Sequence, residues 1–170
     1  MLFAATLVCL LLQTPAGIKF DSPAGWVSKA PSSSMRVADW TLPKADGDQD
    51  DAMVTLYYFG AGGGGGLQAN IDRWIGQMTQ PDGKPSKAVA TTATLASTSG
   101  LKITTVDIPG TYVAEVTPGS AERFNKPGYR MITALIETAG GAHYVKFVGP
   151  AKTVARWSQS FETFLKSLRQ

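Results

Sequence analysis

The segment from Gly60 to Gly66 contains six glycines in seven residues and constrains the fold more than any other part of the chain. Glycine loses more backbone entropy on ordering than any other residue, so this run is expected to form a loop. Residues 52–59 (AMVTLYYF) precede it and predict a strand, because β-branched and aromatic side chains favour strands. Residues 67–80 follow it and predict an amphipathic helix, because their apolar side chains recur every three or four positions.

The rest of the chain predicts further strands and one more helix. Strands are expected at 18–20, 35–42, 87–95, 101–108, 111–116, 129–138 and 143–148. Gly140 and Gly141 indicate a hairpin between the last two strands. The final helix is expected to start at Gly149-Pro150, with a buried stripe made of Val154, Trp157, Phe161, Phe164, Leu165 and Leu168. This order predicts an α+β fold, in which helices cover a mostly antiparallel sheet of five to seven strands.

Residues 1–16 (MLFAATLVCLLLQTPA) form an uncharged apolar run that ends in small residues. This pattern predicts a cleaved export signal, which leaves residues 17–170 as a single globular domain in the periplasm or outside the cell. The run is too short to span a bilayer, which takes about 20 apolar residues. No membrane span is therefore expected after signal removal.

Two features of this run leave alternatives open. No Lys or Arg precedes the apolar residues, as an ordinary signal requires, so a start further upstream or a buried core segment are the alternatives. A lipid anchor on Cys9 is disfavoured, because Val8 stands where bacterial lipoproteins carry a small residue.

The residue types exclude several kinds of metal site, and neither a metal nor a cofactor is expected. Cys9 is the only cysteine and His143 the only histidine, so thiolate sites and multi-histidine zinc sites are excluded. The acidic residues Asp46, Asp48, Asp50 and Asp51 resemble the start of a calcium loop. The pattern fails, because Asp51 and Tyr57 stand where that loop requires glycine and glutamate.

No pattern of catalytic residues is recognisable, and we expect the protein not to be an enzyme. The glycine run lacks the Lys and Ser or Thr of a phosphate loop, since Leu67 and Gln68 stand there. A flexible connection is expected instead, with an anion at the helix start as the alternative. His143 is expected to be a half-exposed strand residue, and no serine lies in a nucleophile-elbow pattern.

Polar and aromatic side chains suggest a ligand-binding cleft for a peptide, a carboxylate or a glycan. The candidates are Arg36, Asn70, Arg73, Gln77, Tyr112, Tyr129, Arg130 and Lys146. Asn70, Arg73 and Gln77 are three and four residues apart and share a helix face. The alternative is structural, in that Arg73 and Gln77 only tie the helix to neighbouring loops. No basic run interleaved with aromatics indicates nucleic-acid binding.

Three segments, SMRVADW (34–40), FGAGGG (59–64) and NIDRWIGQ (70–77), carry a family resemblance. They resemble a family of uncharacterised exported bacterial proteins with the pattern SMRxAx(aromatic)…GxGG…NxxRWxxQ. At fold level, FDSPAGW (20–26), the strand order and the closing helix resemble the PsbP and Mog1-type α/β/α sandwiches. That likeness implies a non-catalytic accessory or binding role, as in assembly of a larger complex. The glycine run and the lack of a PsbP-type metal site are departures from it.

These observations predict an exported, non-enzymatic binding or accessory protein of the bacterial cell envelope. Its expected partner is an envelope protein or a small anionic or peptide ligand. The first alternative is a small envelope hydrolase with His143 or a carboxylate such as Glu137 as base. The second is a structural or adhesion component of the envelope.

Overall fold

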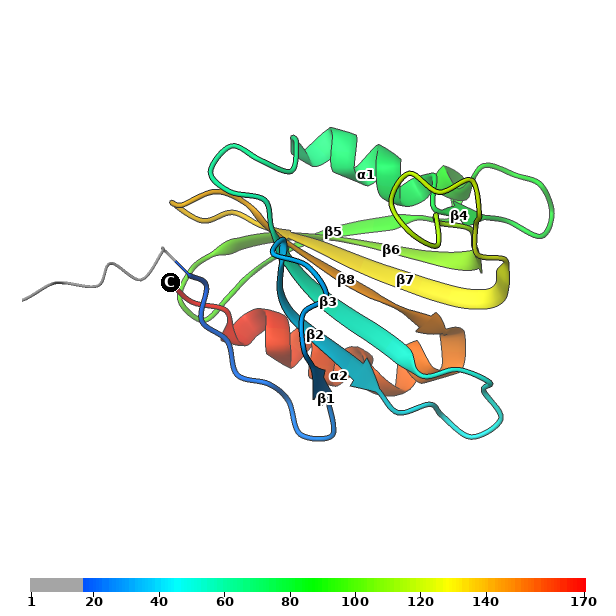
Figure 1. The fold of residues 1–170 in the computed structure, drawn as a ribbon, viewed down its shortest axis with the longest axis horizontal. Coiled ribbons are helices and arrows are strands. Elements are labelled where there is room, and N and C mark those ends of the chain that lie inside the picture. The colour runs from blue at the N-terminus through cyan, green and yellow to red at the C-terminus, as the bar shows by residue number, and fades with distance from the viewer. Residues whose placement is uncertain (1–16) are drawn as a thin grey trace, which may run out of the picture.

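Eight antiparallel strands form one sheet in the order β1-β2-β3-β8-β7-β6-β4, with β5 also pairing with β6 (Figure 1). The structure is a computed structural model that describes residues 17–170, and the expected export signal with Cys9 lies outside the described residues. The strands are β1 (Val27–Lys29), β2 (Arg36–Leu42), β3 (Ala52–Tyr58), β4 (Met78–Thr79), β5 (Thr91–Ala96), β6 (Lys102–Tyr112), β7 (Lys126–Ile136) and β8 (His143–Pro150). The helices are α1 (Leu67–Ile75), α2 (Ala151–Ser167) and the short 3-10 helix η1 (Ser86–Ala88).

The expected α+β architecture with an antiparallel sheet is confirmed. The sheet has eight strands rather than five to seven, because the short strands β1 and β4 extend it at its two ends. Residues 18–20 do not form a strand and contribute one bridge, between Lys19 and Arg169. The hairpin between β7 and β8 turns over residues 137–142, as Gly140 and Gly141 indicate.

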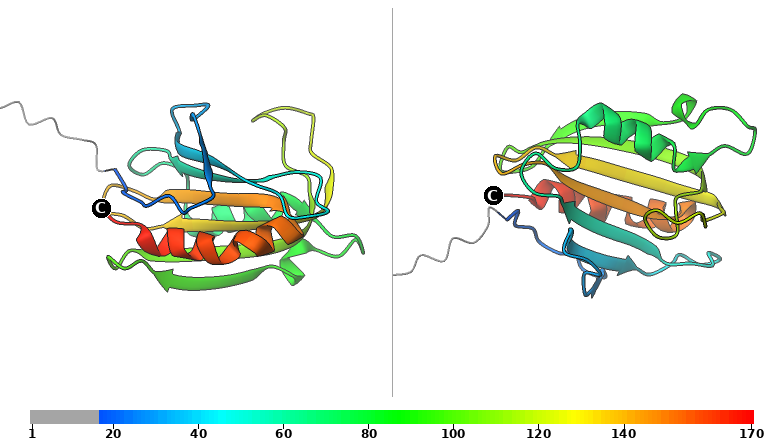
Figure 2. Two further views of the ribbon diagram at one scale, coloured as in Figure 1. Left: turned by 90° about the horizontal axis from the view of Figure 1, so that it is seen from below. Right: turned by 45° about the horizontal axis from the view of Figure 1, so that its top comes forward.

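Helix α2 covers one face of the sheet (Figure 2). Its side chains Phe161, Phe164 and Leu165 are buried, as is Leu168 directly after its end, whereas Trp157 is only half-buried. They pack against alternate residues of the strands, which on β8 are Val145 and Phe147. Phe164 also contacts the rings of Phe20, Trp26 and Trp40, with centroid distances between 5.2 and 5.8 Å. The N-terminal segment is thereby attached to the final helix.

Helix α1 covers part of the opposite face, so the helices and the sheet form three layers (Figure 2). Trp74 of α1 is buried among Val106, Met131 and Leu135 on strands β6 and β7. The helix ends at Ile75 rather than at the expected Gln80. It ends there because the chain turns at Gly76 and places Met78 and Thr79 in β4, paired with Tyr112 and Thr111 of β6.

Among residues 17–170, neither helix is both long and apolar enough to cross a membrane.

We expect replacement of Phe164 by alanine to lower the free energy of unfolding by about 3–5 kcal/mol, the usual loss for a fully buried aromatic ring. Urea denaturation measures the change. Thr163→Ala is the matched control, because Thr163 is an exposed neighbour on the same helix and its loss should change stability by less than about 0.5 kcal/mol. A loss below about 1 kcal/mol for Phe164→Ala would contradict the packing of α2 on the sheet.

Candidate functional site

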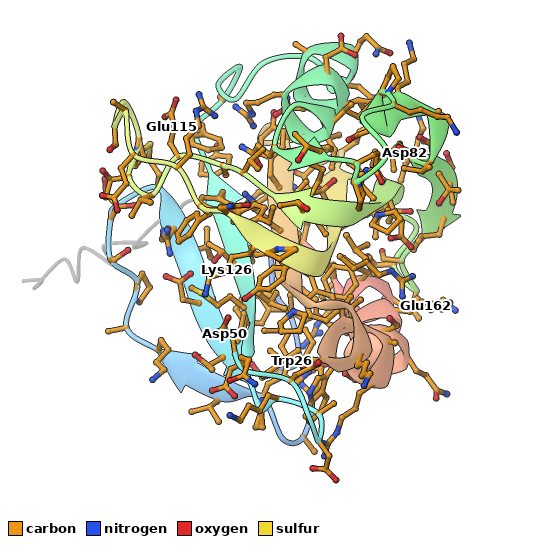
Figure 3. The ribbon with its side chains drawn as sticks, turned by 90° about the vertical axis from the view of Figure 1, so that its right-hand side faces the viewer. Trp26, Asp50, Asp82, Glu115, Lys126 and Glu162 are labelled. Atoms are coloured by element: carbon orange, nitrogen blue, oxygen red, sulfur yellow. The ribbon has the colours of Figure 1, made fainter. Side chains whose placement is uncertain are left out.

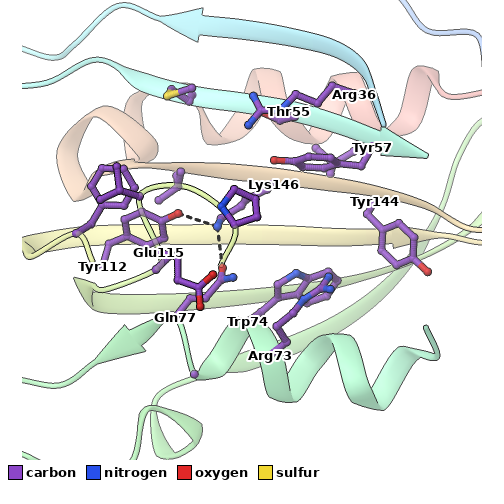
Figure 4. A pocket seen from close by; sticks show the side chains of 18 of the residues that line it. Arg36, Thr55, Tyr57, Arg73, Trp74, Gln77, Tyr112, Glu115, Tyr144 and Lys146 are labelled. Atoms are coloured by element: carbon purple, nitrogen blue, oxygen red, sulfur yellow. Dashed lines mark hydrogen bonds between the residues drawn. The ribbon is translucent and has the colours of Figure 1, made fainter. Parts of the chain in front are cut away.

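A cleft of about 670 Å³ lies between α1, the loop 113–124 and the face of the sheet formed by β3 and β8 (Figure 4). It exists because α1 packs on β6 and β7 and leaves the neighbouring strands of the same face uncovered. The strand residues that line it follow the pleat. Thr55 and Tyr57 of β3 are directly opposite Lys146 and Tyr144 of β8, and all four point to this face.

Lys146 is the central polar group of the cleft. Its Nζ donates hydrogen bonds to Gln77 Oε1 at 2.7 Å and to the Tyr112 hydroxyl at 2.8 Å (Figure 4). Burial, together with the nearby charges of Arg73 and Arg36, lowers the pKa of Lys146 from 10.5 to about 7. Burial also raises the pKa of Tyr112 to about 12, so its hydroxyl stays protonated at neutral pH.

Arg36 enters the cleft from β2, and Asp39 of the same strand holds its guanidinium in place. Its Nη1 donates to Asp39 Oδ1 at 3.0 Å, and the Thr55 hydroxyl donates to the same oxygen at 2.7 Å. Asp39 is only 5% exposed, so this carboxylate acts on Arg36 through a poorly hydrated contact. The guanidinium carbon of Arg36 lies 5.5 Å from the centroid of the Tyr57 ring, within the range of cation–π attraction.

Arg73 enters the cleft from α1 and is linked to the glycine run. It donates to Asn70 Oδ1, and the amide nitrogen of Asn70 donates to the carbonyls of Gly64 and Gly66 at 2.8 and 2.9 Å. The Tyr144 hydroxyl donates to Gly65 O at 3.0 Å. The glycine run was expected to be a flexible connection, but these bonds fix it against α1 and β8.

The cationic groups of the cleft differ in how they are neutralised. Arg36 pairs with Asp39, and Arg123 on the rim pairs with Glu115 at 3.5 Å. Within residues 17–170, neither Lys146 nor Arg73 takes part in an ion pair. The cleft therefore carries positive charge that no carboxylate of the described chain balances.

Five of the eight residues predicted for a ligand site line this cleft, namely Arg36, Arg73, Gln77, Tyr112 and Lys146. Asn70 is buried behind Arg73 and acts as its support. Gln77 does not share a helix face with Arg73, because it lies beyond the end of α1, yet it reaches the cleft.

Two predicted residues lie elsewhere. Tyr129 stacks on Tyr112 with a centroid distance of 6.4 Å, but its hydroxyl donates to Asp50 Oδ2 at 2.6 Å and so points away from the cleft. Arg130 does not line the cleft, because the pleat of β7 places it on the α2 face, where it pairs with Asp107.

Sequence reasoning missed the aromatic and supporting residues of the cleft. Tyr57 and Trp74 lie on opposite walls (Figure 4), and Phe124 closes one end by stacking on Tyr112 at 5.4 Å. Tyr57 and Trp74 belong to segments read only as apolar strand and helix. Asp39 was a usable sequence signal of the cleft. A carboxylate within a strand that is buried in the fold needs a cationic partner nearby.

In the acidic stretch 46–51, three aspartates accept hydrogen bonds from other parts of the chain. Asp48 accepts from the backbone N–H and the hydroxyl of Thr153 at the start of α2. Asp50 lies close to Lys126 (Figure 3) and accepts hydrogen bonds from Lys126 and Tyr129. Asp51 accepts from the backbone N–H of Lys44. No cluster of three or more His, Cys, Asp or Glu within residues 17–170 is arranged to hold a metal ion.

His143 lies outside the cleft. It was expected to be half-exposed, but it is 2% exposed and stacks on Tyr58 with a centroid distance of 4.6 Å. It is buried because the pleat of β8 turns it away from the cleft face that Tyr144 and Lys146 share. Burial lowers its pKa, which favours the neutral imidazole.

Comparison with known proteins adds no relative: no protein-family profile matches the chain, and no curated protein matches it significantly.

We expect Gly64→Ala to destabilise the protein more than Gly62→Ala. Both glycines have positive φ, so each alanine costs about 1–2 kcal/mol of backbone strain. At Gly64 the new methyl would also lie 2.5 Å from the Tyr144 ring, which adds about 1–3 kcal/mol of overpacking, whereas nothing lies within 4 Å at Gly62. Thermal unfolding of the two variants measures the difference. Equal losses would contradict the close approach of the glycine run to Tyr144.

Proposed function

We propose that the protein binds a small carboxylate-bearing molecule in the cleft between α1, the loop 113–124 and strands β3 and β8. We propose further that it releases this molecule unchanged and is not an enzyme. One observation carries this proposal: Lys146 and Arg73, from two different elements, face one cleft and have no carboxylate partner within the described chain. Arg73 is exposed and Lys146 is partly buried, and a ligand carboxylate supplies the negative charge that the described chain does not place beside them.

The form of the cleft favours a ligand with an apolar or aromatic body. Tyr57 and Trp74 form two walls, and Phe124 forms part of one end. Rings of this kind bind apolar groups, and a few polar groups then fix the orientation. Gln77 and Tyr112 are the polar groups nearest to Lys146. A carboxylate near Lys146 and Arg73, with a ring between the walls, satisfies both parts of the cleft.

The wider role follows from the sequence. The apolar residues 1–16 support export, and the family and PsbP or Mog1-type resemblances support an accessory or binding protein of the cell envelope. The alternative of a hydrolase that uses His143 as base is not supported by the geometry, because His143 is buried on the other face of β8.

Isothermal titration with benzoate, and then with peptides that carry a free C-terminal carboxylate, tests the proposal. We expect Lys146→Gln and Arg73→Gln each to weaken benzoate binding at least about tenfold, since a lost charge-assisted hydrogen bond removes about 1.5–3 kcal/mol. Lys29→Gln is the matched control, because Lys29 is exposed on β1, and it should leave binding unchanged.

Two results would contradict the proposal. One is that no carboxylate of either class binds to the folded protein. The other is that all three variants lose affinity equally, which would show that general surface charge, rather than the cleft, attracts the ligand.

A further inference from the structure

The side-chain nitrogen of Lys146 has two hydrogen-bond partners, although it has three hydrogen-bonding positions besides its bond to carbon. A protonated lysine carries three N–H donors, and Gln77 Oε1 and the Tyr112 hydroxyl accept only two. A neutral amine carries two N–H donors and one lone pair, so the same two partners accept from both donors and leave the lone pair free. Among the residues that the structure describes, no carboxylate holds Lys146 in its charged form.

The surroundings also favour the neutral amine. Lys146 lies on the central strand β8, with the threonines Thr55 and Thr133 opposite it on the neighbouring strands. Arg36 and Arg73 add positive charge from β2 and α1, and burial together with these charges brings its pKa to about 7. Lysines become nucleophiles when they are desolvated or lie beside another cation, and both conditions hold here.

We propose that Lys146 condenses reversibly with the carbonyl group of a small 2-oxo acid, whose carboxylate is held by Arg73 and Arg36. This inference rests on the proposed function, because it uses the same cleft and the same carboxylate. It adds the chemical class of the ligand and a covalent bond to it. Arg36 and Arg73 line the same cleft as Lys146. In a 2-oxo acid the carboxylate is directly bonded to the carbonyl carbon, so one small molecule can present both groups there.

The reaction balances without an oxidant, a metal or a cofactor. The lone pair of Nζ attacks the carbonyl carbon, a C–N bond forms, and the electron pair of the C=O π bond moves to oxygen. A proton moves from nitrogen to that oxygen, which gives a carbinolamine. Loss of the hydroxyl group as water, with the second proton of the amine, leaves a C=N bond. The sum is amine plus carbonyl giving imine plus water.

Tyr112 is placed to assist these proton movements. Its hydroxyl is 2.8 Å from Nζ, and burial keeps it protonated at neutral pH. A hydroxyl at this distance both accepts a proton from nitrogen and donates its own to the departing oxygen. Tyr112→Phe keeps the ring that stacks on Phe124 and removes only this group.

Reductive trapping tests the inference. The protein is incubated at pH 7 with glyoxylate and cyanoborohydride, and peptide mass spectrometry gives the rate of modification at each lysine. We expect Lys146 to react roughly tenfold faster than Lys29, which is exposed on β1 and lies outside the cleft. Acetaldehyde has the carbonyl without the carboxylate and should lose most of this preference. Tyr112→Phe should slow the reaction at Lys146 and leave Lys29 unchanged.

The controls separate this inference from the proposed function. Glycolate has the carboxylate but a hydroxyl in place of the carbonyl, and its binding by isothermal titration reports the cleft alone. Glycolate binding without preferential labelling of Lys146 would overturn the imine and leave the proposed function intact. Equal preference with glyoxylate and acetaldehyde would overturn the assignment of a 2-oxo acid. Labelling of Lys146 at the same rate as Lys29 in the folded protein without substitutions would also overturn the inference.

Discussion

The alternation of side chains along β8 is the constraint on which both the core and the cleft depend. Val145 and Phe147 point to the α2 face and are buried there, so their strand cannot shift by one residue without exposing them. The same register turns Tyr144 and Lys146 to the opposite face, between β3 and β7. The free energy that the α2 core contributes therefore also fixes a lysine at the floor of the cleft.

The amine of Lys146, which has no carboxylate partner in the described chain, opposes stability. The fold tolerates it because the core lies mainly on the opposite face of the sheet. The α2 face is filled by a continuous set of aromatic and aliphatic residues, including Trp26, Trp40 and Phe164. The α1 face is only partly covered and leaves Lys146 with neutral partners. Strained or unsatisfied groups that persist in a folded protein concentrate at functional sites, because the remaining structure holds them there.

Local patterns were sufficient to predict most elements and five residues of the cleft, but not the contacts that bring these residues together. The segments around β2, β3, β7 and β8 have clear β-branched and aromatic composition, and the stripe of α2 has helical spacing. The shorter α1 depends on a distant contact, the pairing of Met78 with Tyr112, which local sequence does not contain. The cleft depends on the pairing of β3 with β8, although 85 positions separate the aligned residues Tyr58 and His143 in the sequence. It also depends on the pleat, which places Arg130 on the α2 face instead of in the cleft. Lys146 between Val145 and Phe147, and Asp39 within β2, were local signals of the site.

The most direct test of this account is the titration of Lys146 by nuclear magnetic resonance, with lysine labelled at the ε-carbon and the signal assigned through Lys146→Arg. The account predicts a midpoint near pH 7 in the free protein, as burial and the charges of Arg73 and Arg36 require, and a higher midpoint when benzoate is bound. A midpoint near 10.5, unchanged by benzoate, would show a fully hydrated or paired amine and would contradict the account.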